Sequence, residues 1–392
     1  MQPSACWPVW SIMVEPTVLF IATGLGAGGA EQALIRLLRG LGNGPVRPAL
    51  AALRSGGSLA SEAAGLDLPF MELDMEQGGA GRAAGMIRLV RFARAVRPDI
   101  LQGWMYHGNA AASLTGLAMP GSRVFWSIRQ SLEAPETEQT GTSRLIHRAV
   151  HLRRRPERIV YNSSAAALHH EELGYPEHCR QVIPNGFNTE RFRPDPEARD
   201  RIRDELGLPR DTPLIGMVAR YHPVKDHDGF LRAAALLARL QPGVHFLLAG
   251  AGAGDDNREL LDQVHSRELA GRCHLLGERD DIPAVTAALD VAALTSLSEG
   301  FPNVIGEAMA CGVPVAATSA GETPEILAGI GTVVPCGDPE GMAASWSELL
   351  DMPEEARRTL GDAGRARIQD RYGLTRMISS FEKLYQSPES GG

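Results

Sequence analysis

The 392-residue chain lacks three features that would assign it to common classes of protein. Its five cysteines are scattered, odd in number and never spaced as Cys-x-x-Cys, so neither a disulfide framework nor a structural zinc site is expected. No stretch has the apolar length of a membrane span. Residues 1–16 lack the basic and apolar segments of a signal peptide, and we interpret them as a tail with Met13 as an alternative start. These absences favour a cytoplasmic protein with reduced thiols.

The chain also lacks a basic surplus and has almost no lysine. Its formal net charge is −8 at pH 7. Residues 1–190 contain 18 basic and 16 acidic residues, a net charge of +2, and the remainder contains 21 and 31, a net charge of −10. A general nucleic-acid-binding protein would be more basic, so no nucleic-acid partner is expected. Only two of the 39 basic residues are lysines, Lys225 and Lys383.

The apolar pattern predicts two domains of alternating strands and helices. A chain of this length exceeds one typical core. Apolar strands are expected at residues 18–22, 47–53, 100–102, 125–130, 158–161, 214–218, 245–250, 274–276, 291–294 and 313–316. Continuous apolar strands separated by helices imply parallel sheets covered on both faces. We therefore predict an α/β protein with two Rossmann-like, doubly wound domains facing a cleft. The boundaries are expected at 17–190 and 212–372, joined by a polar connection at 191–211.

A glycine-rich turn follows the first predicted strand and precedes a helix at residues 30–39. Gly24, Gly26 and Gly29 match Gly-x-Gly-x-x-Gly, the pattern of dinucleotide-binding folds. That function also needs an acid after the second strand, where Arg54 stands instead. Three interpretations stay open: a helix N-terminus that approaches a phosphate, an NADP site with Arg54 on the 2′-phosphate, and a purely structural turn.

Polar residues follow two further strands of the first domain. His107 and Asn109 come after the strand at 100–102, and Arg129 lies at the polar tip of the strand at 125–130. Ligands of open α/β sheets gather at such strand ends. His107 is a candidate to orient a hydroxyl or accept a proton, and a structural histidine is the alternative. We expect Arg129 to face the cleft.

Residues 143–158 form a basic run with interleaved apolar residues. Its basic members are Arg144, His147, Arg148, His151, Arg153, Arg154, Arg155 and Arg158. Two interpretations are weighed: peripheral contact with an anionic membrane surface, and an ordinary solvated helix face.

The segment 296–314 contains the densest set of candidate site residues. It predicts a turn through Gly300 and Pro302, a helix from about Val304, and a following apolar strand. Pro302 suits a first helical turn, and the first N–H groups of the helix would then point outward as an anion or hydroxyl site. Glu299 and Glu307 lie at opposite ends of this loop. Such a pair of acids can hold two separated parts of one polyhydroxylated ligand.

A second cationic segment follows the first strand of the second domain. Arg220 is followed five positions later by Lys225, one of the chain's two lysines. A planar guanidinium together with a compact ammonium suits a diphosphate leaving group. Ordinary surface charge is the alternative.

These motifs together resemble one family. Arg220-x4-Lys225-Asp226, the Glu299-x7-Glu307 segment and Gly28-Gly29-Ala30-Glu31 resemble the retaining glycosyltransferases of family 4, which have the GT-B fold. The resemblance covers residues 17–388, and Gln32 departs from it because many relatives have arginine there. It implies an acceptor-side first domain, a nucleotide-sugar-binding second domain, and a helix at 373–388 that returns to the first domain.

The resemblance also implies roles for individual residues. It places Arg220 and Lys225 on the diphosphate, Glu299 on the donor sugar, Glu307 on the ribose, His107 beside donor and acceptor, and Gly28 and Gly29 on the phosphates. Further donor contacts are expected from Arg279, Gly300, Phe301, Pro302, Asn303 and Val304, and acceptor-side contacts from Asn109 and Arg129. Neither a cofactor nor a metal is expected, and Asp74-Met75-Glu76 is a poor metal motif.

The predicted function is transfer of a hexose or N-acetylhexosamine from a nucleotide-diphosphate sugar. UDP-sugar is the first choice and GDP-sugar the second. The predicted acceptor is a glycan or a lipid-linked saccharide in polysaccharide or glycolipid assembly, at the inner face of the membrane. The alternatives are an NADP-dependent oxidoreductase, a nucleotide-sugar epimerase, and a non-catalytic binding protein of the same fold.

Overall fold

A computed structural model describes residues 15–26, 28–75, 79–132, 140–152 and 155–388. The expected tail at 1–16 lies outside the described residues except for its last two positions. Glu76 of the weak metal motif and Arg153 and Arg154 of the basic run also lie outside them.

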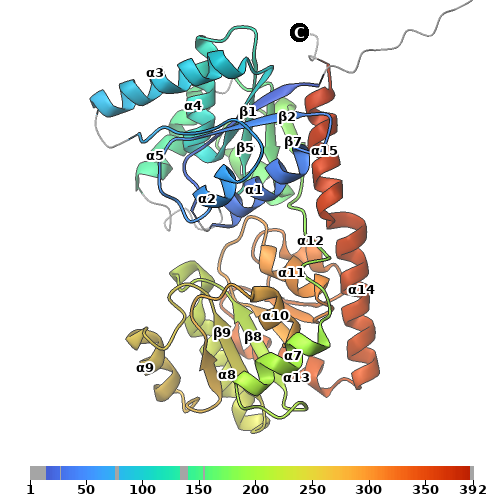
Figure 1. Cartoon of the computed structure of the whole chain (residues 1–392). Coiled ribbons are helices and arrows are strands. Elements are labelled where there is room, and N and C mark those ends of the chain that lie inside the picture. The colour runs from blue at the N-terminus through green and yellow to red at the C-terminus, as the bar shows by residue number, and fades with distance from the viewer. Residues whose placement is uncertain (1–14, 27, 76–78, 133–139, 153–154, 389–392) are drawn as a thin grey trace, which may run out of the picture.

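The first domain combines a parallel sheet with helices on both faces (Figure 1). Its strands are β1 (Thr17–Ala22), β2 (Arg47–Ala52), β3 (Phe70–Glu72), β4 (Ile100–Trp104), β5 (Arg123–Ile128), β6 (Arg158–Tyr161) and β7 (Arg180–Val182). Its helices are α1 (Gly29–Leu41), α2 (Ala60–Ala64), α3 (Gly79–Val96), α4 (Met105–Leu117), α5 (Thr140–Ala149) and α6 (Ser164–Glu172), with 3-10 turns η2 (Val150–Leu152) and η3 (Glu177–Cys179). The strand order is β3-β2-β1-β4-β5-β6-β7.

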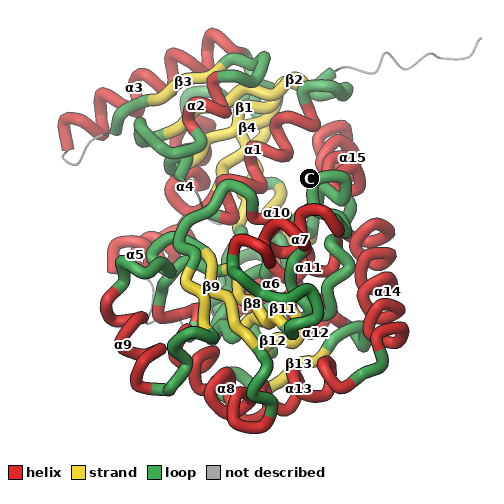
Figure 2. Tube along the Cα trace, turned by 60° about the horizontal axis from the view of Figure 1, so that its bottom comes forward, coloured by secondary structure: helices red, strands yellow, loops and turns green. Residues whose placement is uncertain are grey.

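The second domain repeats this architecture (Figure 2). Its strands are β8 (Leu214–Val218), β9 (His245–Ala249), β10 (Cys273–Leu275), β11 (Val291–Leu294), β12 (Val315–Thr318) and β13 (Thr332–Val334), in the order β10-β9-β8-β11-β12-β13. Its helices are α7 (Pro196–Glu205), α8 (His227–Leu240), α9 (Arg258–Ser266), α10 (Ile282–Ala287), α11 (Asn303–Ala310), α12 (Thr323–Leu327), α13 (Pro339–Asp351) and α14 (Glu354–Tyr372), with the 3-10 turn η4 (Pro223–Lys225). The strands of both sheets pair in parallel, which confirms the predicted doubly wound α/β class.

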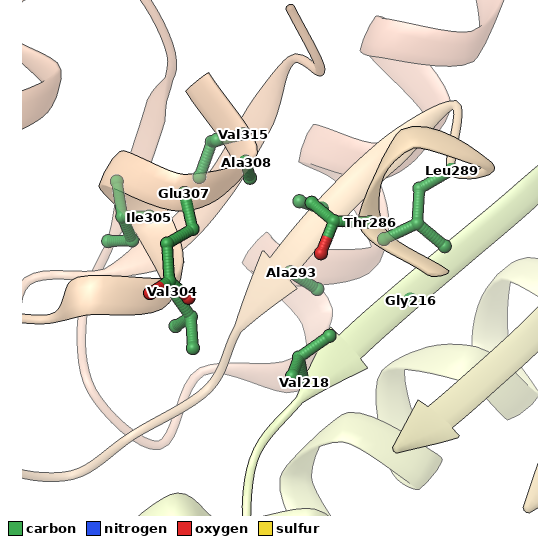
Figure 3. A pocket seen from close by; sticks show the side chains of 11 residues that line it. Gly216, Val218, Thr286, Leu289, Ala293, Val304, Ile305, Glu307, Ala308 and Val315 are labelled. Carbon is green, nitrogen blue, oxygen red and sulfur yellow. The ribbon is translucent and has the colours of Figure 1, made fainter. Parts of the chain in front are cut away.

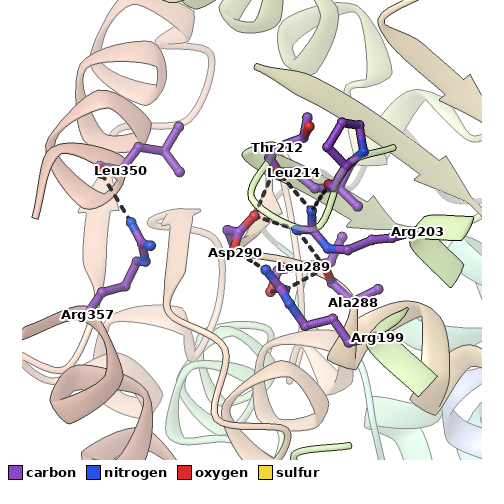
Figure 4. A network of polar contacts seen from close by, with 10 residues as sticks. Arg199, Arg203, Thr212, Leu214, Ala288, Leu289, Asp290, Leu350 and Arg357 are labelled. Atoms are coloured by element: carbon purple, nitrogen blue, oxygen red, sulfur yellow. Dashed lines mark hydrogen bonds and ion pairs between the residues drawn. The ribbon is translucent and has the colours of Figure 1, made fainter. Parts of the chain in front are cut away.

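The connection predicted at 191–211 is wrong for most of its length. Its centre is α7, whose Ala198 and Ile202 lie in the core of the second domain. Arg203 on the same helix is fully buried, and its Nη2 donates to Asp290 Oδ2 at 2.7 Å (Figure 4). Arg199 Nη2 donates to the other carboxylate oxygen of Asp290, also at 2.7 Å. The polar composition suggested a linker, but Arg199 and Arg203 pair with Asp290 inside the domain.

The chain crosses between the domains twice, at one place. Ile183 belongs to the hydrophobic core of the first domain and Phe187 to that of the second domain, so the first crossing lies between them. The return crossing runs beside it: Phe187 N donates to Tyr372 O at 2.8 Å, and Leu374 N donates to Phe187 O at 2.9 Å. Two adjacent crossings joined by hydrogen bonds form a narrow hinge.

Helix α15 (Leu374–Gln386) returns to the first domain, as the resemblance implied. Figure 1 shows α14 and α15 along one side of both domains. Phe381 and Tyr385 are buried in the first core, and Tyr385 OH donates to Gln102 Oε1 at 3.1 Å. The C-terminal segment is therefore part of the first domain's core. None of the helices in the described ranges is long and apolar enough to cross a membrane.

The final predicted strand of the second domain is displaced by two residues. It was expected at 313–316, and β12 runs from Val315 to Thr318. Pro314 has no N–H group to donate to the ladder, although its carbonyl accepts from Ala292 N at 2.9 Å. The proline therefore precedes the strand.

Candidate active site between the two domains

The predicted site segments follow the strands at which each sheet changes direction. In the first sheet the order turns between β1 and β4, and in the second between β8 and β11. The glycine loop at 23–28 follows β1, and His107 comes after β4. Arg220 follows β8, and the loop at 295–302 follows β11. Such switch points are where open α/β sheets bind ligands, so the topology brings the four predicted segments to the two expected places.

Helix α11 begins with open backbone donors. The helix starts at Asn303. Pro302 was predicted to lie in the first helical turn, but it is the N-cap residue, one position before that turn. The ψ of Pro302 is 95°, which is extended, and this is why the helix begins only after it. Pro302 provides no side-chain cap. The N–H groups of Asn303 and Val304 are therefore the first of the helix, and the positive end of its dipole lies behind them.

The loop before α11 touches the first domain closely. A Cβ added at Gly300 would lie 2.9 Å from Gln130 Cα, so only glycine allows this approach. The Phe301 side chain does not face the loop: it is 6% exposed and stacks on Phe187 with ring centroids 6.0 Å apart. Phe301 therefore offers a ligand its backbone, while its ring anchors the loop to the hinge.

Lys225 and Glu299 form an ion pair beside this loop. Lys225 Nζ lies 2.5 Å from Glu299 Oε1, and the two side chains are 21% and 11% exposed. Ser296 Oγ donates to the same carboxylate oxygen at 2.7 Å. Lys225 ends η4, and Asp226 follows in the left-handed conformation with φ of 50° and caps α8 through a bond from Gly229 N. Local turn geometry thus fixes the direction of the lysine.

Arg220 adds a second cation to this region. It is exposed, and it interacts electrostatically with Glu31 of the first domain. Burial raises the pKa of Glu31, while a backbone hydrogen bond and Arg220 oppose that rise. His222 lies near both cations: burial lowers its pKa, and Arg220 and Lys225 lower it further. The arrangement concentrates positive charge where β8 ends.

Glu307 is buried at the domain interface and lines a pocket. The pocket lies between α11 and the strands β8 and β11, and its other lining residues include Val218, Thr286, Ala293 and Val304 (Figure 3). Burial raises the pKa of Glu307, and Arg36 and Arg191 oppose this effect. Arg36 comes from the first domain, and its Nη1 is 3.6 Å from Glu307 Oε1.

The glycine pair of the first domain lies against α11. Gly28 is the N-cap of α1, without a side-chain cap. A Cβ added at Gly29 would lie 2.9 Å from Asn303 Nδ2, tighter than normal contact. The structure therefore brings the N-termini of α1 and α11 to one place, and the Glu31 carboxylate lies over that of α1.

His107 lies in the first turn of α4, which follows β4 without a loop. The junction residue, Met105, has a φ of 63°, which is strained for a residue with a side chain. His107 is exposed. Its pKa is lowered, first by partial loss of hydration and then by Arg54 and Arg82. A neutral imidazole at neutral pH can accept a hydrogen bond from a hydroxyl.

Asn109 does not contact the cleft, contrary to prediction. It is 2% exposed, on the face of α4 that packs against β5. Its Oδ1 accepts from Ser127 N at 3.1 Å, and its Nδ2 donates to Ser127 O at 3.2 Å. The amide is used in fastening α4 to the sheet, because the side chain two positions after His107 points to the opposite face of the helix.

Arg129 is also buried, contrary to the prediction that it faces the cleft. It is 7% exposed, and its guanidinium carbon lies 4.6 Å from the ring centroid of Trp104. Its Nη1 donates to Ile183 O at 3.0 Å and to Asn185 Oδ1 at 3.3 Å. Burial lowers the pKa of Arg129 to about 9, so it stays charged at neutral pH.

Arg129 nevertheless reaches the site through a neighbour. Asn185 Nδ2 donates to Asn303 Oδ1 at 2.9 Å, across the domain boundary. A buried cation thus orients an amide, and the amide holds the first residue of α11.

Arg279 is engaged by two carboxylates of its own domain. Its Nη1 donates to Glu205 Oε1 at 2.6 Å and its Nε donates to Asp281 Oδ1 at 2.8 Å. These hydrogen bonds raise the pKa of Arg279. Among the described residues, no group of three or more histidine, cysteine, aspartate or glutamate side chains is arranged to hold a metal ion. Asp74 of the weak metal motif accepts from Ser55 Oγ at 3.0 Å.

Sequence reasoning missed the contribution of Arg36 and gave no role to Asn185. Arg36 lies between the buried Ile35 and Leu37 on an amphipathic helix, which is the pattern of a solvated position. No spacing rule relates it to Glu307, which is 271 positions later in the chain. Asn185 lies in the segment Pro184-Asn185-Gly186, which fits the same family, and this is the signal that could have found it.

Two Rossmann-like domains with one site between them define the GT-B class of fold. HepE from Anabaena, solved in complex with UDP and glucose, has this architecture: the TM-score is 0.83 with 22% identity, over 95% of this chain and 100% of that one. The family described as Glycosyltransferase Family 4 matches residues 27–191, and that described as Glycosyl transferases group 1 matches residues 198–367. The chain belongs to glycosyltransferase family 4.

Relatives with more specific names match part of the chain. A D-inositol 3-phosphate glycosyltransferase from Saccharomonospora viridis is 29% identical over 299 residues, 72% of this chain and 67% of the relative. A GDP-mannose-dependent alpha-(1-6)-phosphatidylinositol monomannoside mannosyltransferase from Mycolicibacterium smegmatis is 34% identical over 203 residues, 48% of this chain and 52% of the relative. The chain spans about half to two thirds of the length of the curated relatives it matches.

Proposed function

We propose that the protein transfers a glycosyl group from a nucleotide-diphosphate sugar to a hydroxyl of a saccharide acceptor, with retention of configuration. The observation that carries this proposal is the Lys225–Glu299 ion pair at 2.5 Å, beside the open N-terminus of α11 and near Arg220. Cations and backbone N–H groups suit a diphosphate, and a carboxylate suits sugar hydroxyls. A donor that contains both groups fits this constellation.

The reaction would proceed by attack on the face of the sugar from which the diphosphate leaves. The bond from the anomeric carbon to the phosphate oxygen breaks, and a bond to the acceptor oxygen forms. The acceptor proton passes to the departing phosphate oxygen, so no protein nucleophile is required. The family resemblance implies a reaction without a metal. Lys225, Arg220 and the α11 N-terminus stabilise the negative charge that builds on the diphosphate. His107 orients the reacting hydroxyl as a neutral acceptor.

Other residues would bind the remainder of the donor. Glu307 holds the ribose, Gly28 and Gly29 approach the phosphates, and Arg279 lies by the base. Because Arg279 is held by Glu205 and Asp281, base contact through its side chain requires exchange of at least one of these bonds. Its backbone is the simpler contact.

UDP-sugar is the first proposed donor and GDP-sugar the second. UDP is bound by the structural neighbour HepE, and the mycobacterial relative is named for GDP-mannose. A hexose or an N-acetylhexosamine is the proposed sugar. We place the acceptor among glycans and lipid-linked saccharides of polysaccharide or glycolipid assembly, because the names of the relatives include a phosphatidylinositol mannoside.

We further propose that the first domain contacts an anionic membrane through charge alone. Arg144, His147 and Arg148 of α5 are exposed. The interleaved apolar residues are not available for insertion, since Ile146 lies in the first core and Leu145 packs against it. Co-sedimentation with liposomes should therefore require anionic lipid and should weaken as the salt concentration rises. Binding that depends on neither anionic lipid nor salt would contradict the proposal. This contact would place the enzyme at the cytoplasmic face of the membrane.

The proposed donor class can be tested by thermal stability against UDP, GDP, ADP, NADP and the corresponding nucleotide sugars. A ligand at about 100 times its Kd contributes about 2.7 kcal/mol to the free energy of unfolding, which shifts the midpoint measurably. Stabilisation by one nucleoside diphosphate and its sugar, but not by NADP, is expected. Stabilisation by NADP alone would identify the glycine loop as a dinucleotide site and overturn the proposal.

A further inference from the structure

Arg36 is a first-domain side chain that reaches the nucleotide side of the interface. It lies in α1, and its Nη1 is 3.6 Å from Oε1 of Glu307 in α11. The two side chains are only 15% and 11% exposed. The pair therefore joins the two domains in a largely dry environment, on the helix that begins the proposed diphosphate site.

Two of the three guanidinium nitrogens of Arg36 are without a hydrogen-bond partner among the described residues. Its Nε and Nη2 are buried, and neither has a hydrogen-bond partner within the part of the chain that the structure describes. At 3.6 Å the contact of Nη1 with Glu307 is an ion pair beyond full hydrogen-bond distance. Buried donors without partners are rare and costly. A guanidinium with such donors at an interdomain site points to a ligand with acceptor oxygens.

The charges around Glu307 are unbalanced. Arg36 on α1 and Arg191 on the chain after the first crossing both interact with it electrostatically. The thiol of Cys311, on the same helix, is the remaining titratable neighbour, and burial raises its pKa to about 12. Burial raises the pKa of Glu307 and the two guanidinium groups oppose that rise, and the oxygens of a Glu307 carboxylate can accept O–H groups.

We propose that Arg36 is a ribose-binding residue contributed by the first domain, acting together with Glu307. A ribose hydroxyl beside the pair can bridge the two side chains, because it can donate its proton to the carboxylate and accept an N–H of the guanidinium. A phosphate could not donate to Glu307 in this way. The proposal rests on the proposed function and adds to it a donor contact on the opposite domain, so that ribose binding bridges the interface.

The test is calorimetric binding of UDP, GDP and ADP, each compared with its 2′-deoxy and 3′-deoxy forms. Wild type is expected to prefer the ribonucleotide. Arg36→Met should weaken ribonucleotide binding by about tenfold and abolish most of that preference, because the deoxy forms already lack the bridging hydroxyl. The affinity of Arg36→Lys for the ribonucleotide should lie between those of wild type and Arg36→Met, because lysine keeps the positive charge but lacks the planar, several-donor guanidinium. Arg39→Met, at an exposed position of the same helix, is the matched control and should bind like wild type.

The outcomes separate the two proposals. If wild type binds none of UDP, GDP and ADP, the proposed function fails and this inference fails with it. If wild type binds and Arg36→Met binds equally well with the same ribose preference, only the inference is overturned. If Arg36→Met lost affinity equally for the ribonucleotide and the deoxynucleotides, Arg36 would act only as a counterion to Glu307. That result would also overturn the inference. Should Arg36→Met not fold, as judged by its melting midpoint without nucleotide, Arg36→Lys decides by the same comparison.

Discussion

Two cations that follow central strands have opposite surroundings. Lys225, near the end of β8, is 21% exposed and is paired with the carboxylate of Glu299. Arg129, directly after β5, is 7% exposed and is surrounded by Trp104, a backbone carbonyl and the amide of Asn185. Both positions were predicted as site residues partly from the rule that ligands gather at strand ends, and Lys225 also from its spacing after Arg220. The rule locates strand ends, but it does not decide whether the side chain turns toward the ligand or back into the core.

The difference lies in the partners. Glu299 is anionic, so a diphosphate can take over the ammonium while sugar hydroxyls take over the carboxylate. The partners of Arg129 are neutral and structural, and a ligand cannot replace them without opening the core. A charged residue at a strand end therefore indicates a binding site only when a ligand can replace its partner in the protein.

The largest expected effect is on catalysis, from Lys225→Ala. Loss of the ammonium should reduce kcat by about 100- to 1,000-fold, because one preorganised charge on the leaving diphosphate is lost. The melting midpoint should fall only modestly, because Glu299 loses its cation but keeps the hydrogen bond from Ser296 Oγ. The chain has one matched control: Lys383, its only other lysine, is exposed on α15, and Lys383→Ala should behave like wild type. Full transfer activity in Lys225→Ala would end the proposed mechanism.

The second effect is on stability, from Arg129→Ala. It should lower the free energy of unfolding by about 3 kcal/mol, because Ile183 O, Ser127 Oγ and Asn185 Oδ1 lose a buried charged donor. Urea unfolding measures this loss, with Arg94→Ala on the exposed face of α3 as control. If the Arg129→Ala variant had wild-type stability but no activity, Arg129 would be a functional residue like Lys225, and the contrast between the two cations would be wrong.

The smallest effect extends the comparison to a buried titratable group. Burial lowers the pKa of His170 to about 4, below its ordinary value of 6.5. The unfolded chain therefore takes up a proton as the pH falls below 6.5 while the folded chain does not, so stability is lost on acidification. Between pH 7.5 and 5.0, His170 should account for about 2 kcal/mol of that loss.

The measurement compares urea unfolding at both pH values in wild type and in His170→Gln. The variant should lose about 2 kcal/mol less on acidification, because glutamine does not titrate. His178→Gln, at an exposed position close by, should lose as much as wild type. Equal losses in wild type and His170→Gln would show that His170 is protonated in the folded state.

Much of the fold was predictable, because its signals are local. Apolar runs located the ten predicted strands within about two residues, as at β8 and β11, where the bounds agree. The three-residue strands β3, β7 and β13 were missed, because they are too short to give a clear apolar run. The segments assigned wrongly were those whose charged side chains pair with residues far away in the sequence. Helix α7 looked like a linker because its arginines meet Asp290, which is 87 positions from Arg203.

The candidate site divides in the same way. Sequence alone determined the Arg220 and Lys225 segment, the Glu299 to Glu307 loop and the glycine turn, because each is a contiguous motif at a strand–helix junction. Tertiary structure alone decided that Asn109 and Arg129 turn inward, that Asn185 holds Asn303, and that Arg36 meets Glu307. The physical reason is range: turns and helix ends form from neighbouring residues, whereas burial and pairing depend on which surfaces the two domains bring together.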